Sequence, residues 1–187
     1  MGKVIGLSGY AQSGKSTVSS MLQQMVPGAV VINFADCIRD LTRTINPYIE
    51  DGSGNYLRWN DVEDVIGYER VKAETSGREF LISLGQGARD TVWHDVWVDA
   101  WRIKALQSDA PLVIAEDARY LNEARAVTDL HGQVWYIERP GVQAVHETEE
   151  RAIQEVLQSG LVRREIPNSH TPGWLEEHVD DALYRYV

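Results

Sequence analysis

Short apolar runs alternate with longer amphipathic segments along the chain, and this alternation predicts the secondary structure. Apolar runs of strand length occur at residues 3–8, 29–34, 111–116 and 133–137, with a shorter one at 164–167. An apolar position every three or four residues predicts helices at about 15–25, 37–45, 61–74, 78–106, 121–130, 148–158 and 174–186. Strands that alternate with helices in this way predict an α/β fold, in three layers (α/β/α), around a mostly parallel five-stranded sheet.

The segment between the second and third predicted strands is longer than this fold requires. A crossover needs only about a dozen residues, whereas residues 46–108 lie here and carry two predicted helices. We therefore expect a single domain, residues 1–187, with a helical insertion at about 46–108. Its first part, residues 47–60, is rich in turn-forming residues and is expected to be a loop.

The long helix predicted at 78–106 has two notable features. Gly85 and Gly87 weaken it, so we expect a break at these glycines. Trp93, Trp97 and Trp101 follow one another at spacings of four and therefore share one helix face. Tryptophans at this spacing form core packing more often than a ligand platform, so we favour a buried face.

The most informative motif follows the first predicted strand. Gly9, four further residues and Gly14-Lys15-Ser16 match G-x-x-x-x-G-K-[ST], the phosphate-binding loop. Its glycines let successive backbone N–H groups point into one concavity, and the helix that follows adds its own free N–H groups. An ordinary Gly/Ser-rich turn is the alternative, but the strand-like run before the motif and the helical segment after it favour phosphate binding.

This motif assigns a task to each of its residues. Lys15 is placed to reach the β- and γ-phosphates of a nucleotide, and the Ser16 hydroxyl to ligate Mg²⁺. Acidic residues follow two other predicted strands, Asp36 and Asp117, and Asp117 is the candidate for the second Mg²⁺-associated carboxylate. The residues expected around the phosphates are Gly9, Ala11, Gln12, Ser13, Gly14, Lys15, Ser16 and Thr17.

Composition narrows the range of partners. A formal net charge of -10 argues against binding to a nucleic acid polymer, which requires a basic face. The single cysteine, Cys37, allows no internal disulfide. His146-Glu147 begins like a zinc-binding H-E-x-x-H motif, but Glu150 stands where the second histidine would be. The chain also lacks the N-K-x-D motif of GTPases and the L-S-G-G-Q motif of ABC ATPases.

Arginines after strand ends and in the insertion point to a second anion. Transfer of a phosphoryl group between two phosphate compounds brings two anions together, and guanidinium groups bind such oxygens bidentately. For any single arginine, a solvated surface charge is an equally good interpretation. As a set they favour a small kinase: Arg39, Arg78, Arg89, Arg119, Arg139, Arg151, Arg163 and Arg164.

Four segments carry a family resemblance. Asp36-Cys37-Ile38-Arg39 resembles the D-x-L-R-like segment of nucleoside monophosphate kinases. Residues 78–89 with Trp97, and residues 117–123, are similar to segments of bacteriophage deoxynucleoside monophosphate kinases. Residues 167–175 resemble an ending shared with dephospho-coenzyme A kinases, although Thr-Pro-Gly replaces the usual Gly-Thr.

The resemblance implies a P-loop kinase that uses ATP and Mg²⁺ to phosphorylate deoxynucleoside 5′-monophosphates. It implies catalytic roles for Lys15, Asp117 and Arg119 and contact of Arg139 with ATP. It implies that the acceptor is bound by Asp36, Arg39, Arg78, Gln86, Arg89, Trp97 and Glu123, with Gln86 and Trp97 facing the base. Residues 139–164, which contain several arginines, would form a mobile lid.

Two other functions stay open at this point. A dephospho-coenzyme A kinase shares the phosphate loop and the C-terminal pattern, but leaves the insertion with Arg78 and Trp97 unexplained. A non-catalytic module that binds a nucleotide and passes on a conformational change is the third option. No apolar stretch approaches the ~18 residues of a membrane helix, and no leader pattern is evident, so we expect a cytoplasmic location, the host cytoplasm for a viral protein. A homodimer is one option for the assembly.

Overall fold

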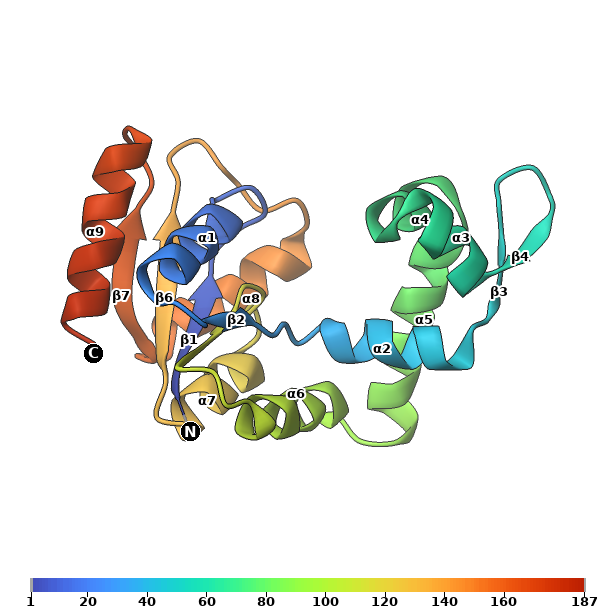
Figure 1. The fold of residues 1–187 in the computed structure, drawn as a ribbon, viewed down its shortest axis with the longest axis horizontal. Coiled ribbons are helices and arrows are strands. Elements are labelled where there is room, and N and C mark those ends of the chain that lie inside the picture. The colour runs from blue at the N-terminus through green and yellow to red at the C-terminus, as the bar shows by residue number, and fades with distance from the viewer. Residues whose placement is uncertain (1, 187) are drawn as a thin grey trace. The chain divides into compact units, whose positions relative to one another are not determined.

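The computed structural model describes residues 2–186 and contains an α/β arrangement (Figure 1). In chain order the elements are β1 (Lys3–Ser8), α1 (Lys15–Met25), β2 (Val30–Val31), α2 (Asp36–Ile45), β3 (Tyr48–Glu50), β4 (Tyr56–Arg58), α3 (Trp59–Ile66), α4 (Tyr68–Glu74), α5 (Gly77–Thr91), α6 (Val96–Gln107), β5 (Leu112–Ala115), α7 (Leu121–Asp129), β6 (Gln133–Glu138), α8 (Glu147–Gln158), β7 (Val162–Pro167) and α9 (Pro172–Tyr184).

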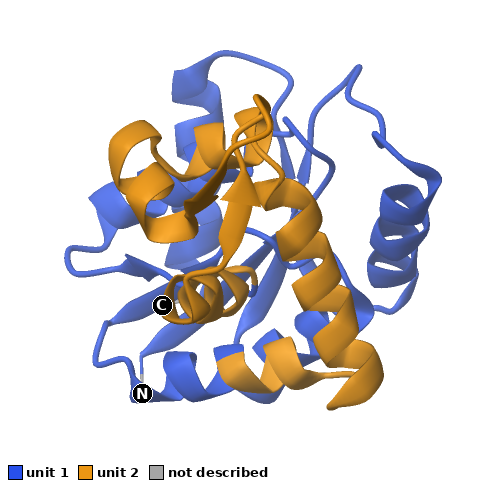
Figure 2. Ribbon diagram, turned by 90° about the vertical axis from the view of Figure 1, so that its right-hand side faces the viewer, with its two compact units in different colours: residues 1–34, 101–187 blue, residues 35–100 orange. Residues whose placement is uncertain are grey.

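The chain divides into two compact units (Figure 2). Unit 1 comprises residues 1–34 and 101–187, and unit 2 comprises residues 35–100. The second unit therefore includes α2, ahead of the insertion expected from residue 46 onward.

Unit 1 contains the five-stranded sheet that the alternating pattern predicts. The strand order is β2-β5-β1-β6-β7, and every neighbouring pair is parallel. β1 lies at the centre, with Gly6 opposite Ala115 of β5 and Ser8 opposite Tyr136 of β6. Because parallel strands end on the same edge, the segments that follow β1, β5, β6 and β7 come together there.

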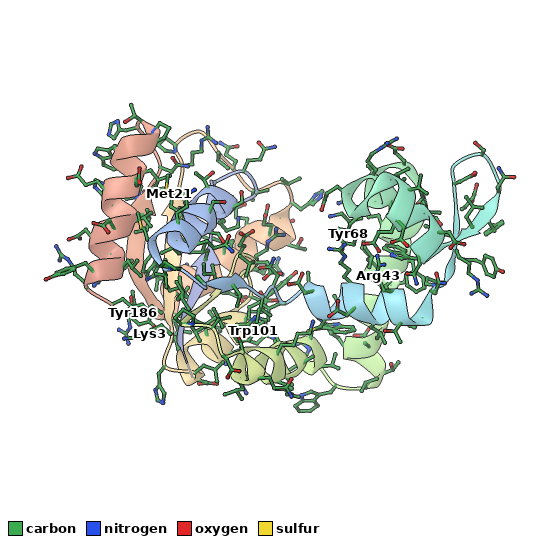
Figure 3. The ribbon with its side chains drawn as sticks, in the orientation of Figure 1. Lys3, Met21, Arg43, Tyr68, Trp101 and Tyr186 are labelled. Carbon is green, nitrogen blue, oxygen red and sulfur yellow. The ribbon has the colours of Figure 1, made fainter. Side chains whose placement is uncertain are left out.

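Helices cover both faces of this sheet (Figure 1). One face packs against α1 and α9, whose Val18, Leu22, Leu175 and Val179 join the main apolar cluster. α7 and α8 pack on the opposite side, where Val127, Ile153 and Val156 are fully buried. The C-terminal Tyr186 also contacts β1, since its hydroxyl accepts from the Val4 N–H at 3.2 Å and donates to the Val4 carbonyl at 3.1 Å (Figure 3).

Unit 2 is a small helical body with a two-stranded antiparallel hairpin, β3–β4. Its core consists of Ile49, Trp59 and Val71, with Val62, Ile66, Tyr68 and Leu81 packed around them. The hairpin occupies residues expected to be a loop, because the turn at 51–55 lets the short strands Tyr48–Glu50 and Tyr56–Arg58 pair. Asp51 holds that turn, since its carboxylate accepts from the backbone N–H groups of Ser53 and Asn55.

The long helices of unit 2 break at places other than those expected. The helix predicted at 61–74 divides at Gly67, which has a φ of 83°. The break predicted at Gly85 and Gly87 is wrong: α5 runs through both glycines and ends at Thr91. Gly85 suits this helix because a Cβ there would lie only 3.3 Å from the Ile38 Cδ1. The ~1 kcal/mol that glycine costs in a helix does not interrupt α5 at either position.

The tryptophan face is confirmed for two of its three members. Trp97 and Trp101 are buried, whereas Trp93 is exposed and precedes α6. Trp101 stacks on Phe34, with ring centroids 4.3 Å apart, and its Nε1 donates to the Ile32 carbonyl. α5 ends before Trp93, because the N–H groups of Val92 and Trp93 both bond to the Ala88 carbonyl. Among residues 2–186, no helix combines the length and apolar character that a membrane crossing requires.

Gly6 gives a test of the packing between β1 and α7. An added Cβ would lie 2.8 Å from the Val127 Cγ2 and 3.2 Å from the Ala118 Cβ, so Gly6→Ala should destabilise the protein by about 1–3 kcal/mol. Gly87→Ala is the control, because its Cβ would meet no heavy atom of the described chain within 4 Å, and it should be neutral or stabilise α5. Urea unfolding of both variants measures the difference, and equal effects would contradict the close approach of α7.

Candidate functional site

The phosphate loop follows the central strand β1 and leads into α1. Gly9 and Gly14 have φ values of 138° and 103°, which side chains with a Cβ rarely adopt. A Cβ on Gly9 would lie 2.6 Å from the Ile137 carbonyl oxygen, and one on Gly14 would lie 2.4 Å from the Asn168 Nδ2. Gln12 also takes a left-handed conformation, with a φ of 64°. Backbone geometry and close packing thus both require the two glycines of the motif.

Lys15 lies at the first residue of α1 and is almost fully buried, with 9% of the residue exposed. Its Nζ donates to the carbonyl oxygens of Gly9 and Tyr10, both at 2.7 Å. Burial, together with the positive charge of Arg119, lowers the pKa of Lys15 to about 8, although the nearby acidic groups Glu149, Asp117 and Glu116 act in the opposite direction. The loop therefore holds an ammonium group whose charged form an arriving anion would stabilise.

Two residues that follow other strands of unit 1 contact the loop, and a third contacts the segment that follows β2. After β7, the Asn168 Nδ2 donates to the Ser13 carbonyl at 2.9 Å. After β6, the Arg139 Nη1 donates to the Gln12 carbonyl at 3.2 Å. After β5, Asp117 accepts from the Phe34 backbone N–H at 3.0 Å through Oδ1. The edge predicted from the strand pattern is therefore where these polar groups meet.

Glu149 of α8 contacts the loop directly. Its Oε1 accepts from the Ala11 N–H at 3.3 Å, and its Oε2 accepts from the Val145 N–H at 2.9 Å. The neighbouring Gln154 donates from Nε2 to the Tyr10 hydroxyl at 3.2 Å. A carboxylate therefore lies on a backbone N–H group of a loop whose sequence is typical of phosphate binding.

Glu123, expected to bind the substrate, has a structural contact at the start of α7. It is buried, and its Oε2 accepts from the backbone N–H groups of Arg119 at 2.8 Å and Tyr120 at 3.0 Å. These are free N–H groups at the start of α7, so the carboxylate caps that helix. In doing so it fixes the backbone that carries the exposed side chain of Arg119.

The groups at this edge fit a nucleoside triphosphate with Mg²⁺. Ser13 Oγ is buried and has no hydrogen-bond partner among the described residues, and Lys15 Nζ bonds only to loop carbonyls. Ser16 is exposed at the start of α1. Residues 2–186 contain no cluster of three or more acidic, histidine or cysteine side chains that could hold a metal alone. Mg²⁺ usually takes one or two protein oxygens and completes its shell with phosphates and water, and the Ser16 hydroxyl and the Asp117 carboxylate are oxygens of that kind.

The expected acceptor residues other than Glu123 all belong to unit 2. Arg39 of α2 bonds to Glu63 of α3, whereas Arg78 and Arg89 of α5 form no hydrogen bond or ion pair with the described residues of unit 2. Gln86 is exposed and donates to the Asp90 carboxylate at 2.8 Å. Trp97 is buried, and its Nε1 donates to the Gly85 carbonyl at 2.9 Å. Asp36 is the first residue of α2.

A cavity of about 290 Å³ also lies in unit 2, away from these side chains. Its apolar lining comes from Leu57, Val62, Val65 and Ile66, and its polar lining comes from Asp51, Asp61, Glu74 and Thr75. None of the expected acceptor residues lines it.

Several residues with contacts at these sites were missed by the sequence analysis. Asn168 could have been found as the first polar residue after the last strand, because the loops after parallel strands share one edge. Glu149 follows no such rule, since it lies inside a helix. Glu63 gives no signal either, because its partners on α2, Arg39 and Arg43, lie 24 and 20 positions away in the sequence.

Comparison with known proteins shows a likeness of fold. No protein-family description matches the sequence, and no curated protein sequence matches it. The solved structure of TT1252 from Thermus thermophilus matches with a TM-score of 0.54 and 18% identity, over 100% of this chain and 98% of that one. A dephospho-CoA kinase from Campylobacter jejuni matches with a TM-score of 0.50 and 11% identity, over 100% and 98% of the two chains. At such identities the likeness shows the shared α/β fold.

The lowered pKa of Lys15 predicts proton uptake when ATP binds. With a pKa of about 8, Lys15 is about half deprotonated at pH 8, and phosphate oxygens beside it raise that pKa. ATP binding at about pH 8 should therefore take up roughly half a proton, and ATP affinity should fall as the pH rises further. Calorimetry in buffers of different ionisation enthalpy measures the uptake. Lys15→Arg should abolish it, and its absence from the unaltered protein would contradict the buried, partly neutral amine.

The contact between Glu149 and the loop predicts that removal of the Glu149 charge strengthens ATP binding. A carboxylate on the Ala11 N–H competes with a phosphate oxygen and repels it, so Glu149→Gln should tighten ATP binding by about threefold to tenfold. Glu150→Gln, one position along the same exposed helix end, is the matched control and should have little effect. Direct titration of ATP decides the point, and weaker binding to Glu149→Gln would mean that the carboxylate supports the nucleotide site.

Proposed function

We propose that this chain is an ATP-dependent kinase that phosphorylates deoxynucleoside 5′-monophosphates to diphosphates. The observation that carries the proposal is the loop at residues 9–15, with Lys15 buried at its end and Asp117, Arg119 and Arg139 on neighbouring strand ends of the same unit. The likeness to a dephospho-CoA kinase supports a kinase of some kind, because that fold accommodates phosphoryl transfer in at least that protein.

Unit 1 would bind the donor. Backbone N–H groups of residues 9–17 and the Lys15 ammonium would hold the phosphates, while Ser16 and Asp117 would supply oxygens for the metal. When bound, Mg²⁺ neutralises phosphate charge and favours loss of the γ-phosphoryl group from the β-phosphate oxygen. Arg119 would add positive charge near Lys15, where its effect on the pKa of that amine is already present.

Unit 2 would bind the acceptor. Arg39, Arg78 and Arg89 would contact the monophosphate, and Asp36, Gln86 and Trp97 would contact the nucleoside. The guanidinium groups of Arg78 and Arg89 have no partner in the described part of unit 2, so they are available to an anion. Residues 139–164, expected to act as a lid, comprise a loop, α8 and the start of β7. Because Ala152, Ile153 and Val156 anchor α8 and β7 pairs with β6, the loop before α8 would supply the lid movement.

A dephospho-coenzyme A kinase is the second candidate, and the solved Campylobacter jejuni enzyme is the observation that favours it. A module that only binds ATP is the third. Both alternatives use the same donor site, so only the acceptor distinguishes the three functions.

The test is a coupled assay for ADP formation with each of the four deoxynucleoside monophosphates and, in parallel, with dephospho-coenzyme A. We expect turnover with at least one monophosphate and none with dephospho-coenzyme A. Lys15→Ala should reduce that turnover by ~10²–10³ or more, since it removes a cation from the transferred phosphoryl group. Lys3→Ala, at the opposite end of β1, is the control and should retain activity.

The three functions give different results in this assay. Turnover of dephospho-coenzyme A alone would assign the second candidate. ATP binding without turnover of any acceptor would assign the module. A folded Lys15→Ala variant with normal turnover would remove the kinase proposal altogether.

A further inference from the structure

Glu63 of α3 is a buried carboxylate at the centre of a cationic cluster in unit 2. The residue is only 5% exposed, and its Oε1 accepts from both Nε and Nη2 of Arg39. Its Oε2 accepts from the Trp59 Nε1 at 2.6 Å and forms an ion pair with Arg43, whose Nη1 lies 2.8 Å away. One carboxylate therefore accepts three hydrogen bonds and also pairs with a second guanidinium group, so that both arginines of α2 contact it.

This arrangement has a cost that packing alone would avoid. Burial by itself would raise the pKa of Glu63, but the hydrogen bonds from Trp59 and Arg39 outweigh it, and the pKa lies below its usual value. The carboxylate is therefore held charged in a place where an apolar side chain of similar size is often as stable or more so. A buried charge in such a place points to a task other than stability.

Both arginines that Glu63 holds are partly open to solvent, although Arg43 Nη2 also donates to the exposed carboxylate of Asp64 at 3.1 Å, which an arriving anion would have to displace. Arg39 and Arg43 are four residues apart on α2 and so share one face, and their side chains are 41% and 39% exposed. Arg39 Nη1 and Arg43 Nε form no hydrogen bond with the described residues. Two guanidinium groups side by side would repel each other, and the shared carboxylate behind them offsets that repulsion.

Tyr68 of α4 fixes the direction of Arg39. The Arg39 guanidinium lies over its ring, 4.5 Å from the centroid, and the Lys72 Nζ lies over the same ring at 4.5 Å. Figure 3 shows Tyr68 and Arg43 on facing elements of unit 2. Arg39 is thereby held at its edge by Glu63 and on its face by the aromatic ring, which leaves its remaining N–H groups with little rotational freedom.

We propose that Glu63 is a positioning residue that holds Arg39 and Arg43 as a paired-guanidinium site for a phosphomonoester dianion. Planar N–H donors that are already oriented bind phosphate oxygens with a small loss of side-chain entropy. The inference rests on the proposed function only in taking that dianion to be the phosphate of the acceptor. It adds Arg43 and Glu63 to the residues that act on this substrate, and neither contact follows from the sequence motifs.

The opposing explanation is simple charge compensation, and two substitutions separate it from positioning. Glu63→Gln keeps the shape but removes the charge, whereas Glu63→Asp keeps the charge but shortens the reach to the arginines. Compensation alone predicts tighter phosphate binding by Glu63→Gln, because the site becomes more positive, and no change for Glu63→Asp. Positioning predicts weaker binding by both variants.

The experiment titrates the full-length protein with 2-deoxyribose 5-phosphate and follows the side-chain Nε–H resonances of arginine by NMR. Unphosphorylated 2-deoxyribose is the ligand control, and Glu74→Gln, whose exposed carboxylate pairs with Arg70 in the same unit, is the protein control. We expect the dissociation constant for the phosphate ester to rise about tenfold or more in both Glu63 variants and to stay within about twofold in Glu74→Gln. ATP affinity should be unchanged in all three.

Each outcome supports or overturns the inference. Tighter binding by Glu63→Gln, unchanged binding by Glu63→Asp, or no shift of any arginine resonance in the unaltered protein would overturn it. Thermal unfolding shows whether each variant is folded, and if Glu63→Gln does not fold, Glu63→Asp decides. If the Glu63 substitutions weaken binding of the phosphate ester but the protein shows no kinase turnover, the anion site stands and the proposed reaction is wrong. If the protein turns over a monophosphate but the Glu63 substitutions leave the Michaelis constant for that monophosphate unchanged, the reaction stands and the positioning role of Glu63 is wrong.

Discussion

Burial of the Lys15 ammonium at the end of the central strand is the constraint that the rest of this edge satisfies. A buried amine needs acceptors, and without an anion it takes the carbonyl oxygens of Gly9 and Tyr10. Those carbonyls are within reach only because the loop curls tightly, and the curl requires Gly9 and Gly14. The pKa of Lys15 is nevertheless lowered, because these carbonyl contacts do not fully offset the burial of its charge. A phosphate beside the ammonium group would favour its charged form, so the loop suits an anion.

Carboxylates contact the proposed anion sites of both units, but in two different positions. Glu149 lies in front of the loop, on an N–H group that a phosphate oxygen would use, so a ligand has to displace it. Glu63 lies behind Arg39 and Arg43, on N–H groups that face the protein interior, so a ligand leaves it in place. The first arrangement tunes affinity by competition, whereas the second fixes geometry. This difference explains why removal of each charge is expected to have the opposite effect on binding.

Features that depend on local sequence patterns could be predicted from the sequence, whereas contacts between distant residues could not. The parallel sheet, the loop and the polar residues after β5 and β6 were predictable, because strand runs and the spacing of Gly9, Gly14 and Lys15 are local patterns. The continuation of α5 through Gly85 was not, since it depends on Ile38 from another helix. The contacts of Glu63 and Glu149 were equally hidden, because helix packing brings distant residues to them. The capping contact of Glu123 could have been expected from its place three residues after Tyr120, because Glu at that position is typical of a capping box.

The net charge of -10 makes the cationic clusters more informative than they would be in a basic protein. Long-range attraction cannot bring anions to such a surface, so any anion site must be built from local groups. Unit 1 alone offers enough of these for ATP, and a module that only binds the nucleotide would need nothing more. Unit 2 nevertheless places two guanidinium groups on a buried carboxylate and leaves Arg78 and Arg89 without partners within that unit. A second anionic substrate would explain why unit 2 holds these guanidinium groups and buries a charged carboxylate behind two of them. For this reason we prefer the kinase proposal to the module that only binds ATP.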